Sequence, residues 1–456
     1  MKKYQRNAAL FGFHTFYYLS VELLINDLAE MVIGAQNVVY LYGATCFAVS
    51  GGFLLFPLLR SWLGGYRARR VTLFLAWLIN IMALACTAWT KAPVMFVFAA
   101  LLTTISAGFI GGYMFHAIAM NPVDKGTLGR FFAVVYSVAI GFQYLVGWIS
   151  GLMGERTLFF CVTLYCLCIS VVSYVLLFRT RRVNVFAAVR HTPVLAPDIR
   201  KYSMVALLII IILTAMLGLS DGIVTSLHAG QTINVSGVLR LLCIPSTLLA
   251  GFLYDYKEEK YFPLLTMICM VVLMLAIFLF NNEADFDIAL SILYICWPPA
   301  TIAATAMLTR VAPATALPDF WVVIGRVAKY TPNGVMAVVG GALFTASSIV
   351  PMAILYVILM ILLLLLFVSQ GKLVILQAQP VAEPPLQPDI GRFGFTKREK
   401  EVFDVILQGA TVAEMAATLY ISEVTVKRHV GSILKKTNLS SRTELLECFG
   451  ENNRSS

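Results

Sequence analysis

Long apolar runs separated by short polar connections fill most of the first 369 residues. A helix needs about 20 apolar residues to cross a hydrocarbon core of roughly 30 Å, and twelve runs reach that length. Because lipid offers the backbone no hydrogen-bond partner, each run is expected to be helical. The runs begin near Ala8, Val38, Val71, Val94, Phe131, Leu158, Met204, Ile233, Phe262, Phe286, Phe320 and Pro351.

The pattern changes beyond residue 369. Residues 370–394 carry four prolines among polar residues, which predicts a linker, and residues 450–456 form a short polar tail. Between them, residues 395–449 divide into four short amphipathic segments. The expected fold is therefore all-α, with a twelve-helix transmembrane bundle of six plus six helices followed by a small four-helix domain.

The four short segments carry helix-start signals. Capping boxes open the first two segments at Thr396-Lys-Arg-Glu399 and Thr411-Val-Ala-Glu414, and Ser422 and Ser441 cap the third and fourth. The second and third segments are joined by a short turn at Tyr420-Ile421. Two helices joined in this way predict a helix-turn-helix, whose second helix enters the major groove of DNA.

Composition supports the membrane assignment. The chain is 59% hydrophobic and only 13% charged, with a mean hydropathy of +0.83, which is too apolar for a soluble protein of 456 residues. Membrane lipid is therefore its expected surrounding. Eight of the nine cysteines lie inside apolar runs, and only Cys448 belongs to the polar end. We expect no disulfide, no metal and no cofactor.

The basic residues report the orientation of the chain. Residues 1–369 hold 23 Lys or Arg against 14 Asp or Glu, a net charge of +9, whereas residues 395–449 hold eight against seven, a net charge of +1. Basic clusters at residues 60–70 and 179–201 fall on the cytoplasmic side if both termini lie in the cytoplasm. This predicts a multi-pass protein of the cytoplasmic membrane with both termini inside the cell. Because the net charge reflects topology, DNA binding has to be argued from particular positions.

The third short segment has two faces. Val426, Val430 and Ile433 recur at helical spacing and form a packing side, which leaves a basic side to meet phosphate. The basic residues on that outward side are Lys427, Arg428, Lys435 and Lys436.

Residues 395–449 resemble the LuxR-type (FixJ/NarL-type) DNA-binding domain of bacterial regulators. The residues that carry the resemblance are Phe395-Thr396, Arg398-Glu399, Glu401-Val402, Gly409, Thr411, Glu414, Ala416, Leu419, Ile421-Ser422, Thr425-Val-Lys427, His429, Ile433, Lys436 and Ser441-Arg442. The resemblance implies that Lys427 and Arg428 are the leading contacts to bases or phosphates of double-stranded DNA. It also implies backbone contacts from Thr425, Lys435 and Lys436, and a homodimer on DNA supported by the fourth helix.

The membrane part resembles the major facilitator superfamily. Its runs split six and six around the long connection at residues 179–203. Between the eighth and ninth runs, Gly251-Phe-Leu-Tyr-Asp255-Tyr-Lys257 looks like the loop signature of that family. The resemblance implies that Gly251 allows close helix approach and that Asp255 and Lys257 belong to a gating loop. The corresponding first-half stretch at residues 64–70 lacks the aspartate.

Ionisable residues inside apolar runs mark candidate ligand contacts, because charge is costly in lipid. Glu22, Asp221 and Arg240 are expected to face a ligand or one another. Arg326 and Lys329, three positions apart on one helical face, are candidates of the same kind, but they fall near a predicted helix end, where long basic side chains can instead reach the interface.

Together these features predict a membrane-anchored one-component transcriptional regulator whose membrane domain senses a small molecule. The alternative is a major-facilitator-like secondary transporter with an appended regulatory domain. An enzyme is not expected, because no nucleophile triad, metal cluster or nucleotide-binding loop occurs in the sequence.

Overall fold

A computed structural model describes residues 2–62, 66–120, 127–187, 197–256, 261–315, 317–346, 349–377, 393–407 and 410–437, together with Leu439 and Leu445. The chain divides into two compact units. The first comprises residues 1–180 and 192–379, and the second comprises residues 181–191 and 380–456. Every regular element among the described residues is helical, so the all-α prediction is confirmed.

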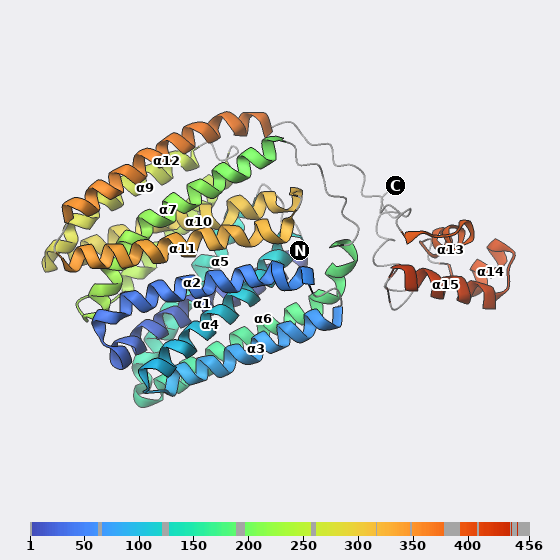
Figure 1. The fold of residues 1–456 in the computed structure, drawn as a ribbon, viewed down its shortest axis with the longest axis horizontal. Coiled ribbons are helices and arrows are strands. Elements are labelled where there is room, and N and C mark those ends of the chain that lie inside the picture. The colour runs from blue at the N-terminus through green and yellow to red at the C-terminus, as the bar shows by residue number, and fades with distance from the viewer. Residues whose placement is uncertain are drawn as a thin grey trace. The chain divides into compact units, whose positions relative to one another are not determined.

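Among the described residues of the first unit, which we call the membrane unit, twelve α-helices occur. Figure 1 shows them running side by side. Its first half contains α1 (Lys2–Ile33), α2 (Ala35–Trp62), α3 (Tyr66–Trp89), α4 (Pro93–Ala119), α5 (Leu128–Met153) and α6 (Thr157–Ala187). Its second half contains α7 (Pro197–Ala229), the 3₁₀ turn η3 (Val238–Leu242), α8 (Cys243–Asp255), α9 (Phe262–Ile277), α10 (Phe286–Val311), α11 (Pro318–Thr345) and α12 (Ile349–Gln377).

Eleven spans in the described part of the chain are long and apolar enough to cross a membrane, and α11 is the long helix of the bundle that falls short. This helix carries Arg326, Lys329 and Asn333, and it packs mainly against α7 and α2. A helix enclosed by other helices can turn polar side chains toward the bundle interior instead of toward lipid. The lower hydropathy of α11 therefore marks a helix that lines the centre of the unit.

Two predicted boundaries differ from the structure. α12 continues to Gln377, so residues 370–377 of the predicted linker are helical, and residues 378–392 lie outside the described part. Arg240, predicted inside the eighth apolar run, lies in η3 ahead of α8. The run that begins near Ile233 is interrupted there, because Gly237 and the 3₁₀ turn precede the α-helix.

The second unit, which we call the helix-turn-helix unit, contains α13 (Lys397–Leu407), α14 (Val412–Leu419) and α15 (Glu423–Thr437). Both predicted capping boxes are present: Thr411 and Glu414 cap α14, and Thr396 and Glu399 exchange the same bonds ahead of α13. The predicted fourth helix lies outside the described residues except for Leu445, which is buried. The core of the unit consists of Phe395, Val402, Phe403, Val405, Ile406, Met415, Val426, Ile433, Leu439 and Leu445.

Candidate functional site

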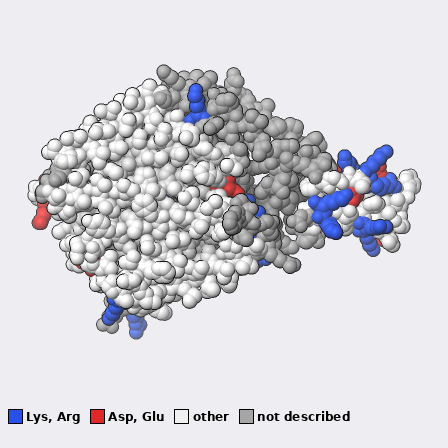
Figure 2. Space-filling model, viewed as in Figure 1, with Lys and Arg blue, Asp and Glu red and all other residues white. Residues whose placement is uncertain are grey.

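The outward face of α15 is basic. Val426 and Ile433 are fully buried, while Lys427, Arg428 and Lys435 are exposed. Figure 2 shows Lys and Arg crowding the surface of the helix-turn-helix unit, whereas the visible surface of the membrane unit is mostly uncharged. Within the described part of the chain, no hydrogen bond or ion pair engages the side chains of these three basic residues. They are available to phosphates and base edges.

The α14–α15 turn fixes where α15 begins. Tyr420 ends α14 in the left-handed region with φ 54°, which redirects the chain within two residues. The hydroxyl of Ser422 then accepts a hydrogen bond of 3.2 Å from the backbone N–H of Thr425 and caps α15. The hydroxyls of Ser422 and Thr425 lie 2.8 Å apart. Thr425 therefore takes part in the cap at the start of α15.

Val424 is a candidate contact that the sequence reasoning missed. Its side chain is 76% exposed, although it belongs to the most hydrophobic residue class. It lies four residues before Arg428, so the two side chains share the exposed side of the first turns of α15. An apolar side chain at this place suits the methyl group of thymine. The sequence did contain a signal for this contact, because Val424 is an apolar residue that lies outside the buried stripe formed by Val426 and Ile433.

Lys436 is placed differently from the expectation that it contacts phosphate. Its Nζ donates to Glu399 Oε2 at 2.6 Å and to the carbonyl oxygen of Gly394 at 2.9 Å. Glu399 also accepts hydrogen bonds from Ser432 Oγ and from the backbone N–H of Thr396. The bonds from Lys436 and Ser432 hold the pKa of Glu399 at about 2, well below its ordinary value. Lys436 thus joins α15 to α13 inside the unit.

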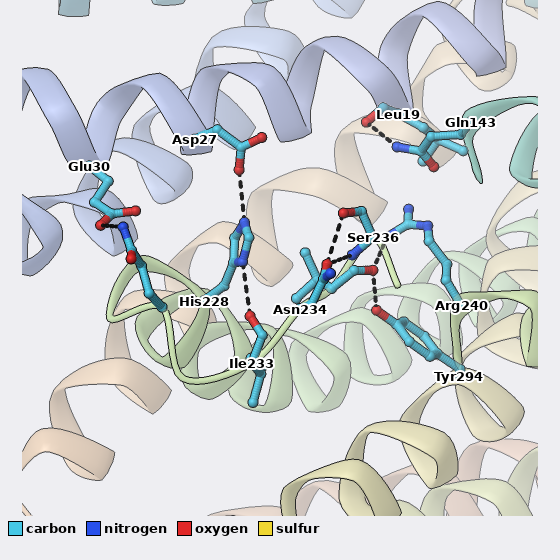
Figure 3. Close-up of polar contacts among 12 residues, drawn as sticks. Leu19, Asp27, Glu30, Gln143, His228, Ile233, Asn234, Ser236, Arg240 and Tyr294 are labelled. Carbon is cyan, nitrogen blue, oxygen red and sulfur yellow. Dashed lines mark hydrogen bonds and ion pairs between the residues drawn. The ribbon is translucent and has the colours of Figure 1, made fainter. Parts of the chain in front are cut away.

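A cavity of about 60 Å³ lies between the two halves of the membrane unit. Helices α1, α2, α4 and α5 of the first half and α7, α10 and α11 of the second half line it. Of the predicted ligand residues, Glu22 and Asp221 line this cavity, whereas Arg240 does not. The side chain of Arg240 instead donates to the carbonyl oxygen of Val235 at 3.4 Å (Figure 3).

Arg326 and Lys329 also line the cavity, so of the two alternatives the structure favours an inward position over one at the membrane interface. α11 begins at Pro318, so Arg326 lies eight residues into the helix, about 12 Å along its axis. The guanidinium of Arg326 is only 2% exposed, lies 4.3 Å from the Phe115 ring centroid and donates to Ala304 O at 3.0 Å. Because apolar runs mark helix ends poorly, the sequence placed these residues too near the surface.

A hydrogen-bonded chain crosses the cavity between the two halves. The hydroxyl of Tyr42 on α2 donates to Asn333 Oδ1 at 2.9 Å, and Asn333 Nδ2 donates to Asp221 Oδ2 at 2.7 Å. Tyr42 belongs to the first half, whereas Asn333 and Asp221 belong to the second. The two hydrogen bonds therefore connect Asp221 on α7 to α2 through Asn333 on α11. Neither Tyr42 nor Asn333 was singled out from the sequence.

Polar contacts also join the halves at the end of the bundle where α1 begins. Asp255, at the end of α8, accepts from the backbone N–H groups of Gly129 and Arg130 at 2.9 and 2.7 Å. This carboxylate therefore caps the start of α5. Gly251 lets α8 approach α5 closely, since a Cβ there would lie 2.3 Å from Ala133 Cβ and 2.6 Å from Gly129 O. Lys257, the third predicted gating residue, lies outside the described residues.

In the first half, where the loop signature lacks its aspartate, a carboxylate from α11 contacts the last turn of α2. Asp319, in the first turn of α11, lies 3.3 Å from Arg60 Nε and 2.7 Å from His116 Nδ1. Arg60 ends α2 and His116 lies in the last turn of α4, so both contacts cross between the halves. The sequence comparison of the two loops could not detect this, because the carboxylate comes from a different helix.

The opposite end of the cavity is bridged as well (Figure 3). Asp27 Oδ1 on α1 lies 2.8 Å from Nε2 of His228 on α7, and His228 Nδ1 lies 3.3 Å from Ile233 O. Gln231 Nε2 donates to Glu30 Oε1 at 2.7 Å. Both nitrogens of His228 face oxygen atoms, and only the protonated imidazolium can donate to both. Contacts therefore join the two halves at both ends of the membrane unit.

Residues 394–449 match the family described as "Bacterial regulatory proteins, luxR family". The chain is 41% identical over 49 residues to the spore germination protein GerE of Bacillus subtilis (strain 168), covering 11% of this chain and 66% of that protein. It is 45% identical over 49 residues to the transcriptional regulatory protein DegU of Brevibacillus brevis, covering 11% of this chain and 21% of that protein. The chain therefore spans less than two thirds of these relatives, and the likeness is confined to the helix-turn-helix unit.

Two solved structures similar to this chain are transporters. The proton:xylose symporter XylE of the major facilitator superfamily aligns over 82% of this chain and 95% of its own, with a TM-score of 0.55 and 14% identity. The nucleoside transporter NupG aligns over 80% of this chain and 99% of its own, with a TM-score of 0.53 and 13% identity. At this identity the likeness describes the fold of the membrane unit. The predicted combination of a LuxR-type domain with a major-facilitator-like bundle is confirmed.

Proposed function

We propose that this multi-pass membrane protein, in which a LuxR-family DNA-binding domain follows a bundle of the major facilitator fold, is a one-component transcriptional regulator that senses a small molecule. The observation that supports this proposal is that one chain combines an exposed basic face on α15 with a central cavity lined by charged side chains. Binding of a ligand in the cavity would favour one arrangement of the two halves over another. The tethered domain would then change its access to DNA or its dimerisation.

The proposed DNA contacts are Lys427, Arg428, Lys435, Thr425 and Val424 on α15. The first three are exposed, and their side chains have no partner among the described residues. Val424 would read a thymine methyl group, and the basic residues would contact phosphates or guanine edges. Lys436 is assigned a structural role instead, because Glu399 and Gly394 already accept from it.

The proposed orientation places both termini in the cytoplasm of a bacterial cell. It is supported by the basic residues at the end of the bundle where α1 begins, including Arg60 and Arg130. Fusion of alkaline phosphatase after residue 283 and after residue 456 tests it. Activity only for the fusion after residue 283 supports the proposal, and activity of the fusion after residue 456 contradicts it.

A DNA-binding and reporter experiment tests the regulatory proposal. Full-length protein in nanodiscs would be titrated with fragments of its own promoter region, with Lys427→Ala and Arg428→Ala as variants. Lys400→Ala removes the same charge from an exposed position on α13 and serves as the control. Loss of sequence-selective binding in the α15 variants alone supports DNA reading. Equal affinities in all four proteins contradict it.

Secondary transport is the second candidate function, and the carboxylates Glu22 and Asp221 in the cavity favour it. Intramembrane carboxylates serve as proton or ion sites in transporters. Gradient-driven uptake into vesicles separates the two functions. Uptake that persists when the helix-turn-helix unit is deleted favours transport, whereas a promoter response without uptake favours a sensor.

A further inference from the structure

The central cavity holds four charged side chains, two of each sign. Glu22 and Asp221 supply carboxylates from α1 and α7, and Arg326 and Lys329 supply cations from α11. Within the described residues, none of the four forms an ion pair within 4.0 Å with an opposite charge. Charges inside a membrane protein are costly unless they are paired. The cavity therefore presents separated positive and negative sites that a ligand could satisfy together.

Asp221 and Lys329 are each held in place by neighbouring side chains. Asn333 Nδ2 donates to Asp221 at 2.7 Å and fixes that carboxylate. The Lys329 ammonium lies 5.8 Å from the Trp297 ring centroid and 5.2 Å from the Tyr330 ring centroid. Aromatic faces attract a cation but leave its N–H donors without acceptors. Lys329 is thus an oriented cation with capacity for a ligand carboxylate.

We propose that the cavity binds a small zwitterion that carries one ammonium and one carboxylate group. The ammonium would lie between Glu22 and Asp221, and the carboxylate would lie on Lys329 with Arg326 behind it. The two acidic and two basic side chains balance, so a ligand without net charge leaves the buried charges balanced. This proposal names the ligand class of the proposed sensor and therefore rests on the proposed function.

The size of the cavity limits the ligand. A cavity of 60 Å³ holds about four to six water-sized positions, which fits a molecule of about the size of alanine. Tyr18, Phe53 and Phe115 line the same space and exclude water from the charged contacts. Exclusion of water strengthens both ion pairs with the ligand.

Thermal unfolding of the full-length protein in nanodiscs tests the proposal. The probes are glycine, L-alanine, β-alanine and γ-aminobutyrate, which separate the two charges by increasing distances. Ethylamine and propionate each carry one of the two charges and serve as matched controls. At least one zwitterion is expected to raise Tm, with about tenfold or greater preference over either single-charge probe. Equal effects of a zwitterion and a single-charge probe overturn the proposal, and so does the absence of any effect from all four zwitterions.

Variants assign the two charged ends. Lys329→Gln is expected to remove the preference for the zwitterion over ethylamine, and Glu22→Gln the preference over propionate. Asp287→Asn and Lys91→Gln make the same charge changes at exposed positions outside the cavity and should change neither preference. If both preferences survive in the cavity variants, the assignment is wrong even if the variants fold less stably.

The same probes separate this inference from the proposed function. If none of the zwitterions binds while Lys427→Ala still abolishes promoter binding, the ligand class is wrong and the regulator remains. If a zwitterion binds while promoter binding of the wild type is absent or unselective, the cavity assignment stands and the regulator proposal fails.

Discussion

The contact between Lys436 and Glu399 gives a prediction that distinguishes a structural lysine from a DNA-binding one. Replacing Lys436 by alanine removes hydrogen bonds to Glu399 at 2.6 Å and to Gly394 O at 2.9 Å. Bonds to charged groups contribute about 1.5–3 kcal/mol each, and the 32% exposure of the lysine side chain lowers the expected loss to about 1–2 kcal/mol. In a domain of this size, that loss lowers Tm by about 5–15 °C.

The pH dependence gives an independent check. The pKa of Glu399 is about 2 in the folded unit, below its ordinary value of 4.5. A lowered carboxylate pKa contributes stability that is present above the unfolded pKa and is lost as pH falls through the folded pKa. The stability difference between wild type and Lys436→Ala should therefore be full at pH 6 and shrink between about pH 4.5 and 2.

Residues 392–456 suit both measurements, because the unit has its own core. Calorimetric unfolding at several pH values gives the stability, and DNA titrations at several salt concentrations give the salt slope. Lys435→Ala is the matched control, since Lys435 is exposed and adjacent. We expect Lys435→Ala to lower the salt slope of DNA binding by about 0.9 without affecting stability. We expect Lys436→Ala to lower stability without affecting the salt slope. A lower slope with unchanged Tm in Lys436→Ala would refute the structural assignment.

Three further predictions concern α15, the α5–α8 contact and the end of the cavity near α7. Val424→Ala should weaken operator binding by about 1 kcal/mol, roughly fivefold, at an unchanged salt slope, because it removes apolar contact without charge; a changed slope in salt titrations would count against it. Gly251→Val should lower the Tm of the nanodisc-embedded protein, because a Cβ at residue 251 would lie 2.6 Å from Gly129 O. Gly147→Val should leave Tm unchanged, because a Cβ at residue 147 would have no atom within 4 Å. Equal Tm values for the two variants would contradict the close approach of α8 to α5. His228→Gln should make the accessibility of a cysteine introduced at Leu217 independent of pH between 5 and 8, because glutamine, unlike histidine, does not gain a proton and a second N–H donor in this range. A pH response equal to that of the same cysteine variant with His228 intact argues against an imidazolium at this contact.

Local pattern was sufficient for the outline of the molecule. The capping boxes at Thr396 and Thr411 depend on residues three positions apart, and both form as expected. The buried stripe of α15 and the apolar helices of the membrane unit follow from periodicity and run length in the same way. The sequence also predicted the α11 helix, but its charged residues gave no indication that this helix lies at the centre of the bundle.

The candidate sites depended more on distant contacts. Glu22 and Asp221, which were expected to face a ligand or one another, both line the cavity, because charge inside an apolar run has few other places to go. Arg240 was not brought to that cavity, since an interruption ahead of α8 places it in η3. The cations that line the cavity are instead Arg326 and Lys329. The position of each residue along its helix decided whether it lines the cavity.

The sequence by itself determined the helices, their caps, the two kinds of unit and the basic face of α15, because these follow from interactions within a few turns of chain. Only the tertiary structure decided which charged groups meet. Lys436 and Glu399 are 37 positions apart, Asn333 and Asp221 are 112 apart, and Asp27 and His228 are 201 apart. Such contacts depend on how helices cross and which faces they turn inward, and a crossing is set by the packing of both helices at once.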